Sequence, residues 1–171
     1  MDLGLPSGIK WATCNIGASS PSDYGDYFAW RETEPNSYTV VTHKTWETEF
    51  GDISGNSQHD AARANWGGSW RLPSLAECQE LRDECSWTWT SQEGHNGCKV
   101  IGPNGNSIFL PAAGGGFVVT DGVGVSGRYW SSTPPYESNP QNAYGFGFIY
   151  GNPYVGYDFR HRGRPIRPVS E

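Results

Sequence analysis

Apolar positions recur at helical spacing in one segment of the chain, residues 70–87. Three- and four-residue intervals place them on one face of a helix. Ser74 and Glu77 have the spacing of a capping box, so this helix is expected to begin after Ser74. A shorter helix is predicted over residues 59–66, with Asp60 as its N-cap. The apolar face of the longer helix carries Leu75, Cys78, Leu81 and Cys85.

After Trp87 the pattern changes to short runs of alternating apolar and polar residues, separated by Gly and Pro. This alternation predicts antiparallel strands joined by long loops. The predicted strands cover residues 98–102, 107–116, 128–133, 143–151, 154–160 and 164–170, with a further candidate at 40–46. We therefore expect an α+β class, with two helices in the first half and a twisted antiparallel sheet in the second. Residues 1–171 are expected to form a single domain.

The composition of the chain argues against some classes of binding partner. The net charge is −6 and the pI is near 5.2, which argues against a nucleic-acid-binding surface. No apolar run approaches the roughly 20 residues that a membrane helix needs, so no direct membrane insertion is expected. Eight Trp and 23 Gly among 171 residues are typical of a loop-rich extracellular recognition domain. The opening residues lack the features of a signal peptide, so an export signal is not expected within this chain.

The cysteines and histidines do not form a recognisable site. Cys14, Cys78, Cys85 and Cys98 lack the paired spacing of a zinc site, and free thiols and one disulfide both stay open. The four histidines are scattered, so no metal and no cofactor are expected. The letters GVGVSG at residues 122–127 match a phosphate-binding fingerprint, but a strand follows them instead of a helix. They are expected to form a loop.

Five blocks of the sequence carry a family resemblance: MDLGLPSGIKWATCNIGASSPSDYGDYFAW, WGGSWRLPSLAECQEL, GNSIFLPAAG, YWSST and IRPVSE. In this order they resemble the Fibrobacter succinogenes major paralogous domain family. The resemblance implies a C-type-lectin-like fold of the formylglycine-generating-enzyme type. It also implies a bacterial cell-surface, extracellular or phage-particle location, as the C-terminal domain of a longer protein. Formylglycine-generating enzymes use a late pair of cysteines, and no cysteine follows Cys98 here, so no enzymatic activity and no catalytic residue are expected.

The last part of the chain has an unusual composition. Residues 142–170 contain no Lys, Glu, Gln, Trp or Met, although these types supply 26 of the 171 residues. Some proteins that the family resembles are variable proteins of diversity-generating retroelements, in which adenines of AAY codons are mutated. Such codons cannot give any of those five residue types. The resemblance therefore implies a diversified binding segment in this region.

Within that segment, family-like frame residues alternate with others. The frame consists of Ala143, Tyr144, Phe146, Phe148, Gly151, Val155, Arg160, Gly163 and residues 167–169. Strand alternation would turn the frame to the core and expose the interspersed residues. The candidate ligand-binding residues are therefore Gly145, Gly147, Ile149, Asn152, Tyr154, Gly156, Tyr157, Asp158, Phe159, His161 and Arg162. Tyr, Gly, Asn and Arg are the residue types of a recognition surface.

The expected function is non-catalytic binding of a protein or glycan on another cell surface. Tyr154, Tyr157, Phe159, His161 and Arg162 are expected to lead the contacts, beside a loop at 114–127 that contains Phe117. The alternative is a carbohydrate-binding adhesin of fixed specificity, in which Trp130 and Tyr136 would stack on sugar rings. Variation confined to the interspersed positions would separate the two.

Overall fold

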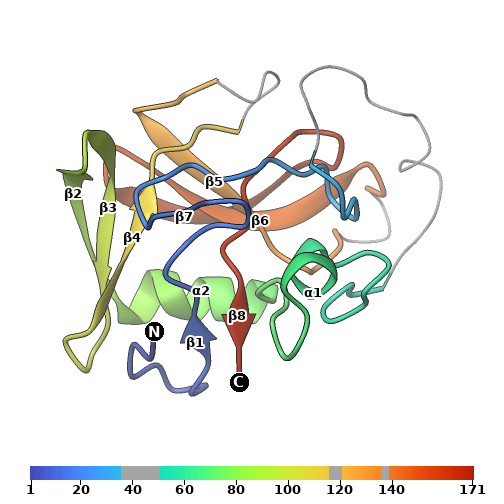
Figure 1. Cartoon of the computed structure of the whole chain (residues 1–171), viewed down its shortest axis with the longest axis horizontal. Coiled ribbons are helices and arrows are strands. Elements are labelled where there is room, and N and C mark those ends of the chain that lie inside the picture. The colour runs from blue at the N-terminus through green and yellow to red at the C-terminus, as the bar shows by residue number, and fades with distance from the viewer. Residues whose placement is uncertain (36–50, 116–120, 136–138) are drawn as a thin grey trace.

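Two short helices lie in the middle of the chain (Figure 1). The computed structural model describes residues 1–35, 51–115, 121–135 and 139–171. Helix α1 (Ala61–Trp66) begins at the predicted N-cap, Asp60. Helix α2 (Leu75–Glu84) begins with the predicted capping box, in which Ser74 and Glu77 each bond the other's backbone N–H. Both helix starts were therefore predicted correctly.

The strands form three antiparallel sheets. The first pairs β1 (Lys10–Trp11) with β8 (Val169–Ser170). The second has the order β2 (Ser86–Gln92), β3 (His95–Ile101), β4 (Ser107–Pro111). The third has the order β5 (Ser126–Trp130), β6 (Asn142–Ile149), β7 (Asn152–Phe159). Antiparallel sheets with separate helices make the class α+β, as predicted.

Several details of the prediction need correction. The described residues before Asp60 hold no helix, so the helices lie next to the midpoint of the chain instead of being spread over its first half. The strands belong to separate sheets instead of one. The long helix ends at Glu84, so Cys85 is a cap residue in an extended conformation. Strand β2 was not predicted, and the strand expected over 164–170 is confined to its last two residues. The candidate strand at 40–46 lies outside the described residues.

The third sheet separates two hydrophobic clusters. Tyr129 and Trp130 are successive residues of β5, so their side chains point to opposite faces. Tyr129 belongs to the cluster that contains Phe146, Phe148 and residues of α2. Trp130 belongs to the cluster that contains Phe28, Trp30 and Ile166. With a core on each face of the sheet, the least covered part is the outer strand, β7.

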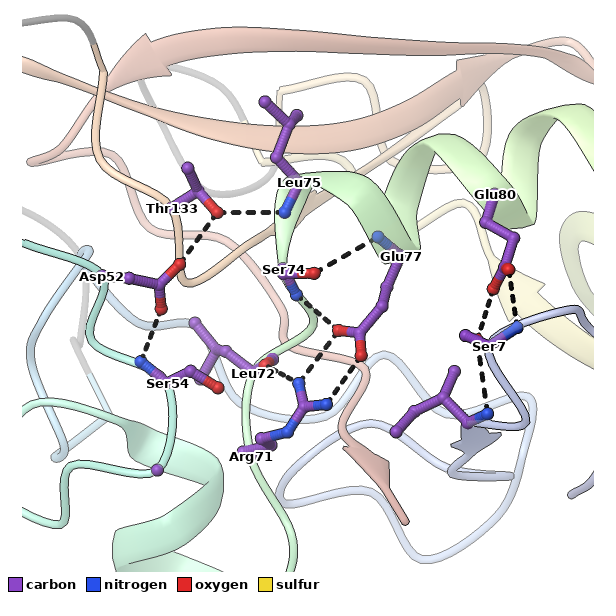
Figure 2. A network of polar contacts seen from close by, with 12 residues as sticks. Ser7, Asp52, Ser54, Arg71, Leu72, Ser74, Leu75, Glu77, Glu80 and Thr133 are labelled. Carbon is purple, nitrogen blue, oxygen red and sulfur yellow. Dashed lines mark hydrogen bonds and ion pairs between the residues drawn. The ribbon is translucent and has the colours of Figure 1, made fainter.

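Hydrogen bonds connect the first two turns of helix α2 to neighbouring segments of the chain (Figure 2). The Leu75 N–H donates to Thr133 Oγ1 at 3.0 Å, and that hydroxyl donates to Asp52 Oδ2 at 3.1 Å. Further along the helix, the Glu80 carboxylate accepts hydrogen bonds from the backbone N–H and hydroxyl of Ser7. Because α2 packs against β6 and β7, these bonds hold the support of the hairpin in place.

The C-terminal segment closes the fold through Arg167, which is fully buried. Its Nε donates to Asn15 Oδ1 at 2.8 Å, its Nη1 to the Thr13 carbonyl at 2.6 Å, and its Nη2 to the Phe109 carbonyl at 3.0 Å. Burial lowers the pKa of Arg167 to about 10. This one side chain therefore joins the start of the chain, strand β4 and the chain end.

Candidate functional site

The predicted site lies on the hairpin of β6 and β7. Tyr150 and Gly151 form its two-residue turn, with φ angles of 46° and 85°. Positive φ at both positions is the geometry of a type I′ turn, whose twist matches that of the strands. The Tyr150 N–H also donates to the Val125 carbonyl at 3.1 Å, which ties the turn to the segment before β5.

The register divides the predicted residues between the two faces of the hairpin. Gly145 lies opposite Gly156, Gly147 opposite Tyr154, and Ile149 opposite Asn152. All six share one face with Asp158, since directly opposed residues point to the same side of a sheet. Tyr157 and Phe159 point to the other face. The candidate residues therefore occupy both faces of the hairpin, because β7 is an edge strand and exposes residues on both sides.

Gly145 and Gly147 are buried, which corrects the expectation that they are exposed. A Cβ at Gly145 would lie 2.2 Å from the Tyr129 carbonyl oxygen. A Cβ at Gly147 would lie 2.4 Å from the Gly127 carbonyl oxygen, and the Tyr154 hydroxyl would lie 2.9 Å away. Neither position has room for a side chain. At Gly156 the nearest neighbour of a Cβ would be the Tyr154 ring at 3.8 Å, an ordinary contact, so a larger residue fits there.

Large exposed apolar side chains gather on this hairpin. Among the described residues, six such side chains are exposed, and four belong to the hairpin. Tyr157 and Tyr150 are the most exposed, at 63% and 60%. The four are Ile149, Tyr150, Tyr157 and Phe159. Tyr150 was missed by the sequence analysis; its place before Gly151 in a tight turn is the signal that would have marked it as exposed.

One end of β7 carries a compact group of side chains. The rings of Phe159 and His161 stack with their centres 5.5 Å apart. The Arg162 guanidinium lies 5.4 Å from the centre of the Phe159 ring, within the range of a cation–π contact. Burial, and then the charge of Arg162, lower the pKa of His161. The structure thus brings together three of the residues predicted to lead the contacts. Tyr157 lies on the same strand face as Phe159 and packs edge-on against Tyr144, with the ring centres 6.1 Å apart.

Asp158 is bound by the protein's own arginines. Its Oδ2 accepts a hydrogen bond from Arg162 Nη1 at 2.9 Å and another from Arg164 Nη2. Arg164 is buried and lies 4.4 Å from the centre of the Trp130 ring; burial lowers its pKa to about 10. Asp158 therefore fixes the segment after β7, and its carboxylate is largely used within the fold.

The sugar-stacking role considered for Trp130 is wrong. Trp130 is fully buried, and its indole N–H donates to the Phe28 carbonyl at 2.9 Å. Tyr136 and Phe117 lie outside the described residues. The described parts of the 114–127 loop consist of turns and isolated β-bridges at Gly114 and Val123, and its end enters β5.

The described residues hold no group of three or more His, Cys, Asp or Glu side chains arranged to bind a metal ion. Their four cysteines are free thiols. In the same residues, no helix has the length and apolar character needed to cross a bilayer. The hairpin offers exposed aromatic area and the partly exposed guanidinium of Arg162, which is paired with Asp158.

Comparison with known proteins finds no family model, no curated protein and no solved structure that matches this chain.

Proposed function

We propose that this chain is a non-catalytic binding domain whose recognition surface is the outer strand β7 and its two ends. The observation that carries the proposal is the exposure of Ile149, Tyr150, Tyr157 and Phe159 on a single hairpin. Exposed apolar side chains concentrated on one hairpin mark an interaction site. Tyr and Phe supply a large contact area at a small cost in side-chain entropy. Arg162 adds a charged anchor beside them.

The partner in this proposal is a protein or glycan on another cell surface. The chain then belongs to a surface-exposed, extracellular or phage-particle protein, and its C-type-lectin-like fold serves as a scaffold for the hairpin. The resemblance to the Fibrobacter succinogenes major paralogous domain family supports this reading. So does the absence of Lys, Glu, Gln, Trp and Met from residues 142–170.

The diversification part of the proposal rests on a division between fixed and free positions. Buried frame residues such as Phe146 and Phe148 hold the hairpin against α2. Gly145 and Gly147 join this fixed frame because no side chain fits there. The positions left for variation are Ile149, Asn152, Tyr154, Gly156, Tyr157, Phe159, His161 and Arg162, with Asp158 restrained by its arginines.

The test is deep sequencing of this locus across the population that carries it. We expect amino-acid replacements to cluster at the free positions, while residues 145–148 stay constant. Synonymous changes in the same codons serve as the internal control for mutation rate. Replacements spread evenly along the chain, or a hairpin without variation, would contradict the diversified surface.

A fixed carbohydrate-binding adhesin is the second candidate, and one observation favours it at a different place. Trp66 is exposed and packs edge-on against Trp70, with their ring centres 5.2 Å apart. Gly67 and Gly68, between them in sequence, have open space where a side chain would lie. An exposed indole beside an open glycine turn offers a stacking surface to a sugar ring. A glycan screen of the Trp66→Ala variant beside the parent chain tests it, and equal binding would reject this site.

A further inference from the structure

Among the described residues, strand β7 is an edge of the third sheet and has β6 as its one neighbour there. The two-residue turn fixes which backbone groups face β6. Ile149 and Asn152 flank the turn and form a hydrogen-bonded pair. The pattern then alternates, so Tyr154, Gly156 and Asp158 also bond to β6. The backbone groups of the residues between them point away from the sheet; these residues are Pro153, Val155, Tyr157 and Phe159.

Both ends of this outward row are closed. Pro153 has no N–H to donate. At the other end, the Phe159 N–H donates to Asp158 Oδ1 at 2.8 Å, and the Phe159 carbonyl accepts the Arg162 N–H at 3.1 Å. In the described part of the chain, Val155 and Tyr157 make no comparable bond with their outward groups. The open part of the edge is therefore a short window centred on Gly156.

We propose that β7 pairs with β7 of a second copy of this chain, in antiparallel register about a twofold axis at Gly156. Val155 of one copy then lies opposite Tyr157 of the other. Each N–H meets a carbonyl, so a reciprocal pair of hydrogen bonds forms on either side of the axis. The two three-stranded sheets become one continuous six-stranded sheet.

The backbone hydrogen-bonding groups and the charged side chains of β7 are both compatible with this pairing. The window presents a donor and an acceptor at Val155 and again at Tyr157, and this arrangement is complementary to itself after a half-turn. Val155 and Tyr157 are uncharged, and Asp158 is already paired with Arg162 and Arg164. The pairing of the two strands therefore brings no unpaired charges of the same sign together. Gly156 has no Cβ on the axis, and the Val155–Tyr157 contact is an aromatic–β-branched cross-strand pair.

The pairing is made by the backbone and does not depend on the proposed function. Only proline at Val155 or Tyr157 would remove a donor, so replacements at neighbouring positions are compatible with it. Tyr154 of the two copies would lie on one face of the joined sheet, near the axis. The dimer would therefore present two copies of the same recognition strand side by side.

Amide hydrogen exchange measured at low and high protein concentration tests the register. The amides of Tyr154, Gly156 and Asp158 should exchange slowly at every concentration, because they bond to β6. The amides of Val155 and Tyr157 should exchange quickly in the dilute monomer. Where about nine-tenths of the chains are paired, their exchange should be about tenfold slower. Sedimentation equilibrium on the same samples gives the fraction of dimer.

A matched pair of variants tests the same contact independently. Tyr157→Pro removes an outward N–H that β6 does not use, and proline is tolerated on edge strands. Tyr157→Val changes the side chain but keeps the N–H. We expect the proline variant to remain a folded monomer at concentrations where the valine variant still dimerises.

Three results would overturn the proposal. The first is a chain that stays monomeric at every concentration, with fast exchange at Val155 and Tyr157. The second is a dimer in which these two amides remain unprotected, which would place the interface elsewhere. The third is protection of both amides in the dilute monomer, which would mean that the chain covers its own edge. None of these results bears on diversification, which the sequencing experiment tests separately.

Discussion

Gly145 on β6 lies directly opposite Gly156 on β7, yet only Gly156 has room for a side chain. We expect Gly145→Ser to lower the free energy of unfolding by roughly 2–4 kcal/mol, because its Cβ would collide with the Tyr129 carbonyl. Gly156→Ser should change it by less than about 0.5 kcal/mol. Urea denaturation of the two variants makes the comparison. Equal losses would show that the hairpin does not discriminate between these positions.

The buried carboxylate of Asp60 organises the start of α1. Its Oδ1 accepts the N–H groups of Ala62 and Arg63, and its Oδ2 accepts those of Gly55 and Leu72. In Asp60→Asn, the amide NH₂ replaces one of these oxygens and faces two N–H donors. We expect a loss of roughly 2–4 kcal/mol in the free energy of unfolding. Chemical denaturation measures this loss, with Asp83→Asn at an exposed position as the control. If Asp60→Asn lost less free energy of unfolding than Asp83→Asn, the role given to Asp60 would be contradicted.

Glu77 connects the helix cap to Arg71 (Figure 2). Burial acts to raise the pKa of Glu77, but hydrogen bonds from Arg71 and Ser74 outweigh it, so the pKa is lowered below 4.5. A lowered carboxyl pKa gives stability that is present above the unfolded value of 4.5 and is lost as the pH falls through the folded value.

We therefore expect Glu77→Gln to lose roughly 1–2 kcal/mol near neutral pH and to show a flatter stability profile in acid. Glu84→Gln, in the exposed last turn of α2, is the matched control. Thermal melts from about pH 7 to pH 2.5 measure both profiles across the window where the lowered carboxyl pKa acts. Parallel profiles for the parent chain and Glu77→Gln would contradict the role given to the ion pair.

The four thiols should differ in reactivity. Burial raises the pKa of Cys98 to about 12 and that of Cys85 to about 11, and it also raises the pKa of Cys78 well above its usual value. Because the thiolate is the reactive form, Cys78 and Cys98 should react with a thiol reagent at least about a hundredfold more slowly than Cys14. Unfolding should release four reactive thiols. Recovery of only two would show a disulfide.

The helix starts were predictable because capping depends on local sequence. The capping bonds of Asp60, Ser74 and Glu77 each span at most three residues. The grouping of strands into sheets was not predictable, because apolar–polar alternation predicts a strand but does not show which other strand pairs with it. Strand β2 was missed because Trp87 and Trp89 are only partly buried, and their partner is Phe148, far along the chain.

The structure places the candidate residues on or directly after one hairpin, but the sequence did not show which of them are accessible. Gly145 and Gly156 look alike in sequence, and only the closeness of β5 to β6 distinguishes them. The sequence alone does not show that the Asp158 carboxylate is paired, whereas in the structure it forms an ion pair with Arg164. Contacts between strands decide which residues of a glycine-rich strand are accessible, and a single sequence does not carry that information.

The position of Arg167 has a consequence for the order in which the molecule can be completed. The groups that receive this side chain, on Asn15 and Thr13, lie 152 and 154 residues before it in the chain. Strand β7 precedes it in the chain. Because β7 lies between the two segments, substitutions that disturb its pairing with β6 also disturb the approach of Arg167 to its partners. A chain in which Arg167 does not reach these partners stays open to proteolysis.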